Sequence, residues 1–192
     1  MTPEQTVATH YRRSIRVQGY DYASAGAYFV TICTQNRDYL FGNIIDGTMR
    51  LNKAGEMIQT VWNEIPGHYI DIDVDEFVIM PNHIHGIIVI VGAGPCACPD
   101  ADSHTNRQPR GVAPTRLSLP DVVHRFKTLT TKRYVDGVKN YRWRPFARTL
   151  WQRNYWEHII RSEDDLNLTR EYIHNNPAQW ELDELYTEMH TA

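Results

Sequence analysis

Apolar residues with a period of two, or in short continuous runs, predict four strands. The first covers residues 27–34 (AYFVTICT), the second lies within 69–80, and the third is the apolar run after Pro81. A fourth is expected over 150–160, where apolar residues alternate in part. Two short extended pieces between 43 and 51 enclose Asp46-Gly47, which is typical of a hairpin turn.

Helical spacing predicts helices between these strands. The first is expected to begin after Asn52, a suitable N-cap, and to run to about Ile65, where Pro66-Gly67 ends it. The second begins after Ser118 and has a proline in its first turn. Its apolar positions from Val122 onward predict one inner side, which leaves its basic residues outside.

A last helix is predicted from Ser162, with an acidic first turn and an end near Pro177. The resulting order is strand, helix, strand, strand, helix, strand, helix. This order is that of the split βαβ arrangement. We therefore expect an α+β, ferredoxin-like fold: an antiparallel sheet with helices packed on it and an additional C-terminal helix.

The length of 192 residues suits a single domain, 1–192, with a basic N-terminal arm (1–25) and a flexible excursion (92–113). No apolar run approaches membrane-spanning length, and the first residues lack the apolar core of a signal peptide. The three cysteines, an odd and small number, indicate reduced thiols. We expect a cytoplasmic protein without a membrane partner.

The net charge of −3 conceals a basic block over residues 107–153, which holds 12 Lys and Arg against two Asp. Aromatic residues are interleaved with these charges, as single-stranded nucleic acid requires. A solvated helix face is the simpler explanation of most charge runs. From the arm and the block, the candidate DNA contacts are Arg12, Arg13, Arg16, Arg125, Lys127, Lys132, Arg133, Arg142 and Arg144.

His83 and His85 begin the third strand with Ile84 between them. Because side chains alternate along a strand, both imidazoles point to the same face. Such a pair can hold a metal ion or clamp a phosphate, although two histidines at a strand end are also ordinary.

The C-terminal helix carries Tyr172 and Asn176, four residues apart and so on one face. A tyrosine can attack a phosphodiester and form a phosphotyrosine, with a metal ion polarising the phosphate. An isolated tyrosine on an amphipathic helix is more often part of the core. The histidine pair favours the catalytic interpretation.

Four segments, spaced through most of the chain, carry a resemblance to a known family: GAYFVT (26–31), MPNHIH (80–85), YWEH (155–158) and YIHNNP (172–177). In this order they resemble the REP-associated tyrosine transposases, which belong to the HUH superfamily of single-stranded DNA transposases. The resemblance runs from about Arg12 to Trp180 and does not account for the excursion.

The resemblance implies a DNA endonuclease and strand transferase with Tyr172 as nucleophile, and a divalent metal, Mg²⁺ or Mn²⁺, on His83 and His85. Asn176 stands where insertion-sequence relatives have a glutamine metal ligand, so it is the further ligand that we expect. His158 and His174 are possible neighbours of the site. The family's substrates are single-stranded DNA hairpins, which the basic block would bind. Relatives act as monomers or as homodimers.

Two other interpretations fit parts of the sequence. A ferredoxin-like order also serves non-catalytic nucleic-acid-binding modules, in which Tyr28 and Phe29 would form a stacking platform. A zinc site could combine the two histidines with Cys96 and Cys98, although their spacing is tighter than usual for zinc.

Overall fold

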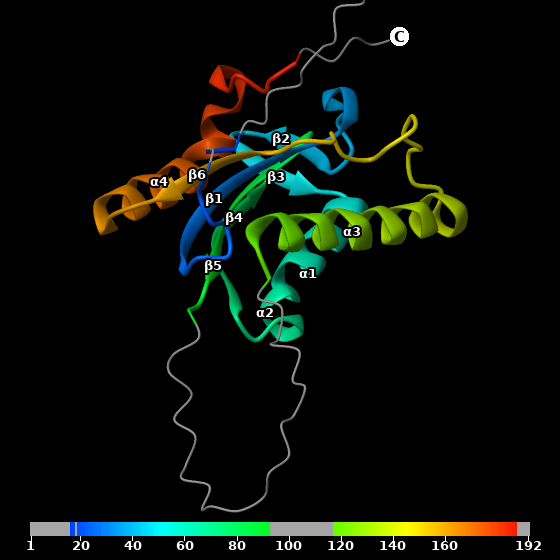
Figure 1. Ribbon diagram of the computed structural model, residues 1–192. Coiled ribbons are helices and arrows are strands. Elements are labelled where there is room, and N and C mark those ends of the chain that lie inside the picture. The colour runs from blue at the N-terminus through cyan, green and yellow to red at the C-terminus, as the bar shows by residue number, and fades with distance from the viewer. Residues whose placement is uncertain (1–15, 18, 93–116, 188–192) are drawn as a thin grey trace, which may run out of the picture.

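The structure is a computed structural model that describes residues 16–17, 19–92 and 117–187. The main elements follow the predicted order, with short ones added (Figure 1). In chain order they are β1 (Gly26–Cys33), η1 (Gln35–Arg37), β2 (Gly42–Ile45), β3 (Thr48–Leu51), α1 (Lys53–Asn63), α2 (Ile65–His68), β4 (Ile72–Ile79), β5 (His83–Ile90), α3 (Leu119–Tyr141), β6 (Trp156–Ile160), α4 (Glu163–Asn175) and η2 (Asn176–Leu182).

The main sheet is antiparallel and has the strand order β4-β5-β1-β6. β1 and β5 lie at its centre, and their register places Thr31 opposite His85. β6 pairs with β1 and forms one edge. This order, with α1 and α3 as the crossing helices, is ferredoxin-like, so the predicted α+β fold is confirmed. β2 and β3 pair with each other in a separate hairpin.

Helices cover both faces of the main sheet (Figure 1). α1 and α3 pack on the face to which Tyr28 contributes, and the main hydrophobic core lies there. α4 packs on the other face through Ile173, which meets Phe29 and Ile87. Tyr28 and Phe29 are both buried, and they lie on opposite faces because side chains alternate along β1. They therefore do not form the stacking platform that the alternative binding-module interpretation would require.

Several local signals work as predicted. Asn52 caps α1 by accepting hydrogen bonds from the backbone N–H groups of Ala54 and Gly55, at 2.9 and 3.0 Å. Ser162 caps α4 in the same way through the N–H of Asp165, at 3.1 Å. The hairpin turns at Asp46 and Gly47, whose φ angles of 50° and 70° are left-handed.

Trp62 of α1 lies directly on the backbone of β5 at Gly86. A Cβ atom at Gly86 would lie 2.4 Å from the indole ring, so only glycine permits this approach. The same indole stacks on Phe77 of β4, with ring centroids 5.5 Å apart. The contact holds α1 against the strand that begins with the two histidines.

Two predicted boundaries are wrong. α1 ends at Asn63, and Pro66 and Gly67 lie inside the short helix α2, where a proline in the first turn is tolerated. The fourth strand is confined to β6 instead of covering 150–160. Residues 150–152 form only an isolated bridge, in which the Gln152 N–H donates to the carbonyl of Cys33 at 2.9 Å. The carbonyl groups of Gln152, Arg153 and Asn154 then accept hydrogen bonds from the Lys127 ammonium.

Some sequence predictions fall outside the described residues. These are Arg12 and Arg13 of the arm, almost the whole excursion, and the two cysteines of the alternative zinc site. Within the described part of the chain, no helix is long and apolar enough to cross a membrane.

Candidate metal and tyrosine site

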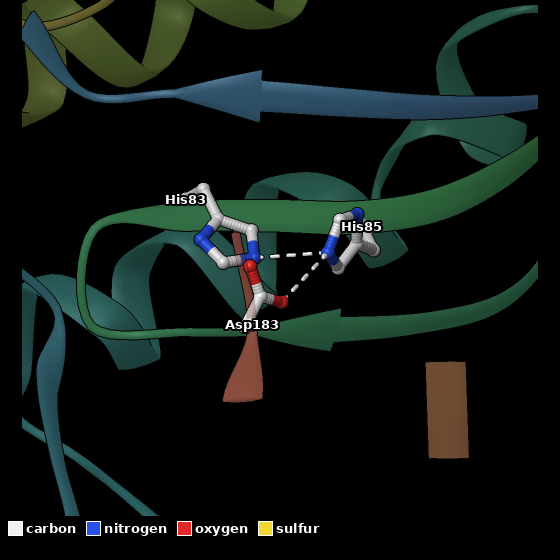
Figure 2. A group of neighbouring side chains, drawn as sticks. All are labelled: His83, His85 and Asp183. Carbon is white, nitrogen blue, oxygen red and sulfur yellow. Dashed lines mark hydrogen bonds and ion pairs between the residues drawn. The ribbon is translucent and has the colours of Figure 1, made fainter. Parts of the chain in front are cut away.

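His83 and His85 lie on β5 and point toward the face that α4 covers (Figure 2). Both are buried almost completely, and their Nε2 atoms are 2.9 Å apart. Strand alternation predicted the shared face, but the burial was not expected. Burial lowers the pKa of both histidines, and for His83 the neighbouring His85 lowers it further. Both imidazoles are therefore held neutral, the form that binds metals.

Each imidazole is oriented through its other nitrogen. His83 Nδ1 lies 2.7 Å from Asn82 Oδ1, while the Asn82 amide nitrogen donates to the carbonyl of Leu185 at 2.9 Å. Because Asn82 Oδ1 can only accept, His83 carries its proton on Nδ1 and presents the Nε2 lone pair. His85 Nδ1 lies 2.8 Å from the hydroxyl of Thr31. That hydroxyl can donate or accept, so His85 Nε2 can either carry a proton or act as a ligand.

The third group is Asp183, directly after η2 (Figure 2). Its Oδ2 lies 3.9 Å from His85 Nε2, and one ligand atom from each of the three residues lies within 4.8 Å of the others. Burial by itself raises the pKa of Asp183, but the nearby His85 imidazole and the hydrogen bonds from the Leu185 N–H and Asn176 outweigh it and lower the pKa. Two imidazoles and one ionised carboxylate form a donor set that suits a divalent cation.

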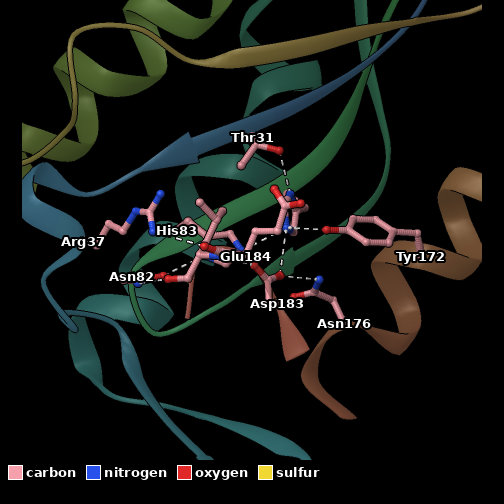
Figure 3. A network of polar contacts seen from close by, with 10 residues as sticks. Thr31, Arg37, Asn82, His83, Tyr172, Asn176, Asp183 and Glu184 are labelled. Carbon is pink, nitrogen blue, oxygen red and sulfur yellow. Dashed lines mark hydrogen bonds and ion pairs between the residues drawn. The ribbon is translucent and has the colours of Figure 1, made fainter. Parts of the chain in front are cut away.

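Sequence reasoning missed Asp183. It is one of nine acidic residues after Arg153, and no spacing singles it out. It reaches the histidines because the short 3-10 helix η2, which begins at Asn176 and has Pro177 in its first turn, leads the chain to them. The following segment is anchored there by Arg37, which donates to the carbonyl of Glu184 at 3.1 Å (Figure 3).

Tyr172 reaches the same place from α4 (Figure 3). Its hydroxyl lies 3.4 Å from His85 Nε2, and its ring meets the rings of His85 and Phe29 with centroids 5.3 and 5.9 Å away. The residue remains 46% exposed. Burial of its inner part, followed by the charge of Asp183, raises the pKa of its phenol. The phenol is therefore protonated at neutral pH and needs a cation nearby to become a phenolate.

Asn176 lines the same pocket as Tyr172, and its amide nitrogen points at Asp183 Oδ2, 3.0 Å away. Its Oδ1 is buried and has no hydrogen-bond partner among the described residues. A buried oxygen without a donor at the border of an imidazole and carboxylate cluster is consistent with a cation site. In this structure, the amide nitrogen of Asn176 orients the carboxylate.

A pocket of about 760 Å³ opens onto these groups. His85, Asp183, Tyr172 and Asn176 line one part of it, and Trp156 and His158 of β6 line another. His158 thus lies in the same pocket as Tyr172. His174 is exposed on α4 and does not line the pocket.

The basic residues of α3 lie on the opposite face of the sheet from this pocket. Arg125 and Lys132 are exposed, and the Arg125 guanidinium lies 5.1 Å from the centre of the Tyr69 ring. Arg133 forms an ion pair with Glu64 at 2.8 Å. Lys127 was predicted to lie on the outer side of α3. Its ammonium instead donates to three backbone carbonyls of residues 152–154, the segment that precedes β6.

The remaining candidate contacts lie near the β6 edge and the end of α3. Arg16 donates to the Tyr155 hydroxyl at 3.5 Å and lies over its ring. Arg142 ends α3 in the left-handed conformation, and Arg144 is exposed with one N–H donating to the carbonyl of Tyr39 at 3.4 Å.

Comparisons with known proteins point to one family. The model of the IS200-like transposases matches residues 112–176, from before α3 to the start of η2, and so includes Tyr172 and Asn176. An uncharacterized protein of Haemophilus influenzae is 41% identical over 190 residues, which is 98% of this chain and 100% of that protein. A second H. influenzae protein, named as a candidate REP-associated tyrosine transposase, is 25% identical over 89% of this chain and 77% of its own length.

A solved structure has the same fold. It is a REP-associated tyrosine transposase bound to a REP hairpin, with a TM-score of 0.52 at 18% identity over 90% of this chain and 74% of that one. Fold, family model and relative agree with the resemblance seen in the sequence. Residues 112–176 thus match the IS200-like transposases, and the chain as a whole is similar in sequence to one REP-associated tyrosine transposase and in fold to another.

Proposed function

We propose that this chain is a metal-dependent single-stranded DNA endonuclease and strand transferase that acts through a 5′-phosphotyrosine on Tyr172. One observation carries the proposal: the Tyr172 hydroxyl lies 3.4 Å from His85 Nε2, an atom of the candidate cation site, in an open pocket. A nucleophile beside such a site is the arrangement that phosphodiester cleavage requires.

In the proposed reaction the Tyr172 oxygen attacks a backbone phosphorus from the side opposite the leaving O3′. The bond from phosphorus to O3′ breaks, and the phenol proton is released as O3′ gains one. Tyr172 is then joined to a 5′ phosphate. A free 3′ hydroxyl attacks that phosphate in the second step, which joins two DNA ends and regenerates the tyrosine.

His83, His85 and Asp183 would hold the divalent metal, for which we propose Mg²⁺ or Mn²⁺. When bound, the metal supplies positive charge that polarises the phosphate and favours the phenolate. Asn82 and Thr31 orient the imidazoles, and Asn176 orients the carboxylate.

DNA hairpins are the proposed substrate. The related structure contains a REP hairpin, and we extend that ligand to this chain as a proposal. The basic residues of α3 and the pocket lie on opposite faces of the sheet. If these residues bind the hairpin, its single strand must therefore pass around the β6 edge to reach the pocket. Arg16 over Tyr155 lies at that edge.

The decisive experiment compares wild type with Tyr172→Phe, which removes one oxygen and keeps the ring. The protein is incubated with labelled single-stranded hairpin DNA and Mn²⁺, separated under denaturing conditions, and any adduct is mapped by peptide analysis. We expect wild type to form an adduct at Tyr172 and the variant to form none while still binding DNA. Tyr155→Phe is the matched control, because Tyr155 packs on the other face and should leave the adduct intact.

An adduct that persists in Tyr172→Phe would overturn the mechanism. Hairpin binding by wild type without cleavage in either metal would instead favour the non-catalytic binding module.

A further inference from the structure

Trp156 and His158 form an uncovered aromatic pair on β6, two residues apart and on one face of the strand. Their rings are nearly parallel, with an angle of 9° between the planes and centroids 6.3 Å apart. Both line the pocket that holds Tyr172, and Trp156 is 49% exposed.

The His158 ring is fixed by the helix that carries the proposed nucleophile. Its Nε2 lies 3.0 Å from both carboxylate oxygens of Asp165, in the first turn of α4. Asp165 also accepts a hydrogen bond from the backbone N–H of Arg161, at 3.1 Å. The ring orientation is therefore set before any ligand binds.

Phe29 connects this pair to the tyrosine. Its ring meets Trp156 edge to face at 5.7 Å and Tyr172 edge to face at 5.9 Å. Phe29 is buried, so its position is fixed by the smaller core under α4. Trp156 and Tyr172 consequently flank one rigid ring, and a nucleotide whose phosphate is next to Tyr172 would have its base within reach of the indole.

We propose that Trp156 and His158 form a stacking site for the nucleobase of a nucleotide adjacent to the scissile phosphate. The inference rests on the proposed function for the identity of the ligand. Flat π faces accept any base, so the site would position the strand and leave the reading of its sequence to other contacts. Removing a stacking ring from such a site weakens binding by about 5- to 150-fold.

The first test measures binding without cleavage, in the Tyr172→Phe background. Fluorescence anisotropy gives the affinity for an oligothymidylate and for an abasic strand of equal length, which carries the same phosphates. We expect Trp156→Leu to abolish most of the preference for the strand with bases and to leave affinity for the abasic strand unchanged. Trp156→Phe should keep most of the preference.

Leu182→Ala is the matched control, because Leu182 is an exposed apolar residue that lines the same pocket but has no ring. It should leave the preference unchanged. Trp156→Leu also retains apolar contact with Phe29, and its melting temperature reports whether the fold survives. An unchanged preference in a folded Trp156→Leu protein would overturn the proposal.

The second test locates the base. Thymidines of the oligonucleotide are replaced by 5-iodouridine, and photocrosslinked peptides are mapped. A crosslink to Trp156 or His158 supports the site, whereas crosslinks confined to aromatic residues elsewhere contradict it. Neither test requires cleavage, so a failure of Tyr172 as nucleophile would leave both results interpretable.

Discussion

The side-chain amide of Asn176 donates a 3.0 Å hydrogen bond to Asp183 Oδ2, the same oxygen that lies 3.9 Å from His85 Nε2. The residue one turn after the tyrosine thus acts on the candidate cation site through a carboxylate from the following segment. Such outer partners typically change metal affinity by about 10- to 100-fold when removed. The sequence predicted Asn176 itself as a metal ligand.

The first prediction ranks these two residues. Asp183→Asn keeps the shape and removes the charge, so we expect Mn²⁺ affinity to fall by more than about 100-fold, since an outer partner alone is worth about 10- to 100-fold. Asn176→Ala should lower affinity by about 10-fold, because the carboxylate remains but loses its orienting donor. Isothermal titration calorimetry with Mn²⁺ measures both. Glu184→Gln is the control, since that neighbouring acid is exposed. Tighter binding by Asp183→Asn than by Asn176→Ala would contradict the assignment.

The two histidines could be placed from the sequence because their relation is local: alternation along one strand fixes it. Tyr172 was found because the segment YIHNNP carried the family resemblance. Asp183 depends on how a 3-10 helix turns after Pro177 and on the anchoring of its successor segment by Asn82 and Arg37, which no local pattern encodes.

The prediction that Lys127 is free to contact DNA is contradicted for a related reason. Helical periodicity places its side chain on the side of α3 away from the core, and this follows from the geometry of a single helix. The chain at 152–154 returns over the helix and captures the ammonium, and this return is a tertiary contact between residues 25 to 27 positions apart. A periodic pattern describes one helix and carries no information about what crosses it.

The second prediction concerns acid stability of the metal-free protein. The pKa of both histidines is lowered in the fold by burial, so an unfolded chain takes up protons near pH 6.5 while the folded chain does not. Stability should therefore fall as pH drops below about 6.5, by up to about 1.4 kcal/mol per pH unit for each histidine that stays neutral. Thermal unfolding from pH 7.5 to 5 with a chelator present measures the slope.

His83→Asn and His85→Asn test the source of that slope. Each should be less stable than wild type at pH 7.5, because both side chains are buried and paired. Each should also lose stability less steeply as the pH falls. Equal slopes in wild type and both variants would show that other groups cause the acid dependence.

The third prediction concerns the anchor of α4. Arg170 binds Asp75 of β4 with two hydrogen bonds, at 2.6 and 2.9 Å. That bond is the main reason that the pKa of Asp75 is lowered. Both side chains are partly exposed, so we expect Asp75→Asn to cost about 1 kcal/mol, or about 2–4 °C in melting temperature. Cleavage should slow as well, because Tyr172 is two residues from Arg170.

The pH dependence of this anchor has a definite sign. Because the pKa of Asp75 is lower in the fold than in the unfolded chain, its contribution is present above about pH 4 and is lost as the pH falls further. The difference between wild type and Asp75→Asn should therefore close below about pH 4. Glu163→Gln is the control, since Glu163 lies 3.7 Å from Arg170 and is highly exposed. If Glu163→Gln lowered the melting temperature as much as Asp75→Asn does, net charge and not the paired geometry would be what holds α4 in place.

The last prediction separates basic residues that bind DNA from those that bind the protein. Arg125, Lys132, Arg142 and Arg144 are exposed, whereas the Lys127 ammonium is bound by three backbone carbonyls. Each phosphate contact on a single strand contributes about 0.7 to the slope of log affinity against log salt concentration. Changing the four exposed residues to Ala should lower the slope for hairpin DNA by about 3. Lys127→Met should lower the melting temperature and leave the slope unchanged. Anisotropy titrations at several salt concentrations measure both. The contrary result is a slope that falls with Lys127→Met but not with the fourfold variant. It would place the DNA on the β6 edge and show that the exposed residues of α3 do not contact it.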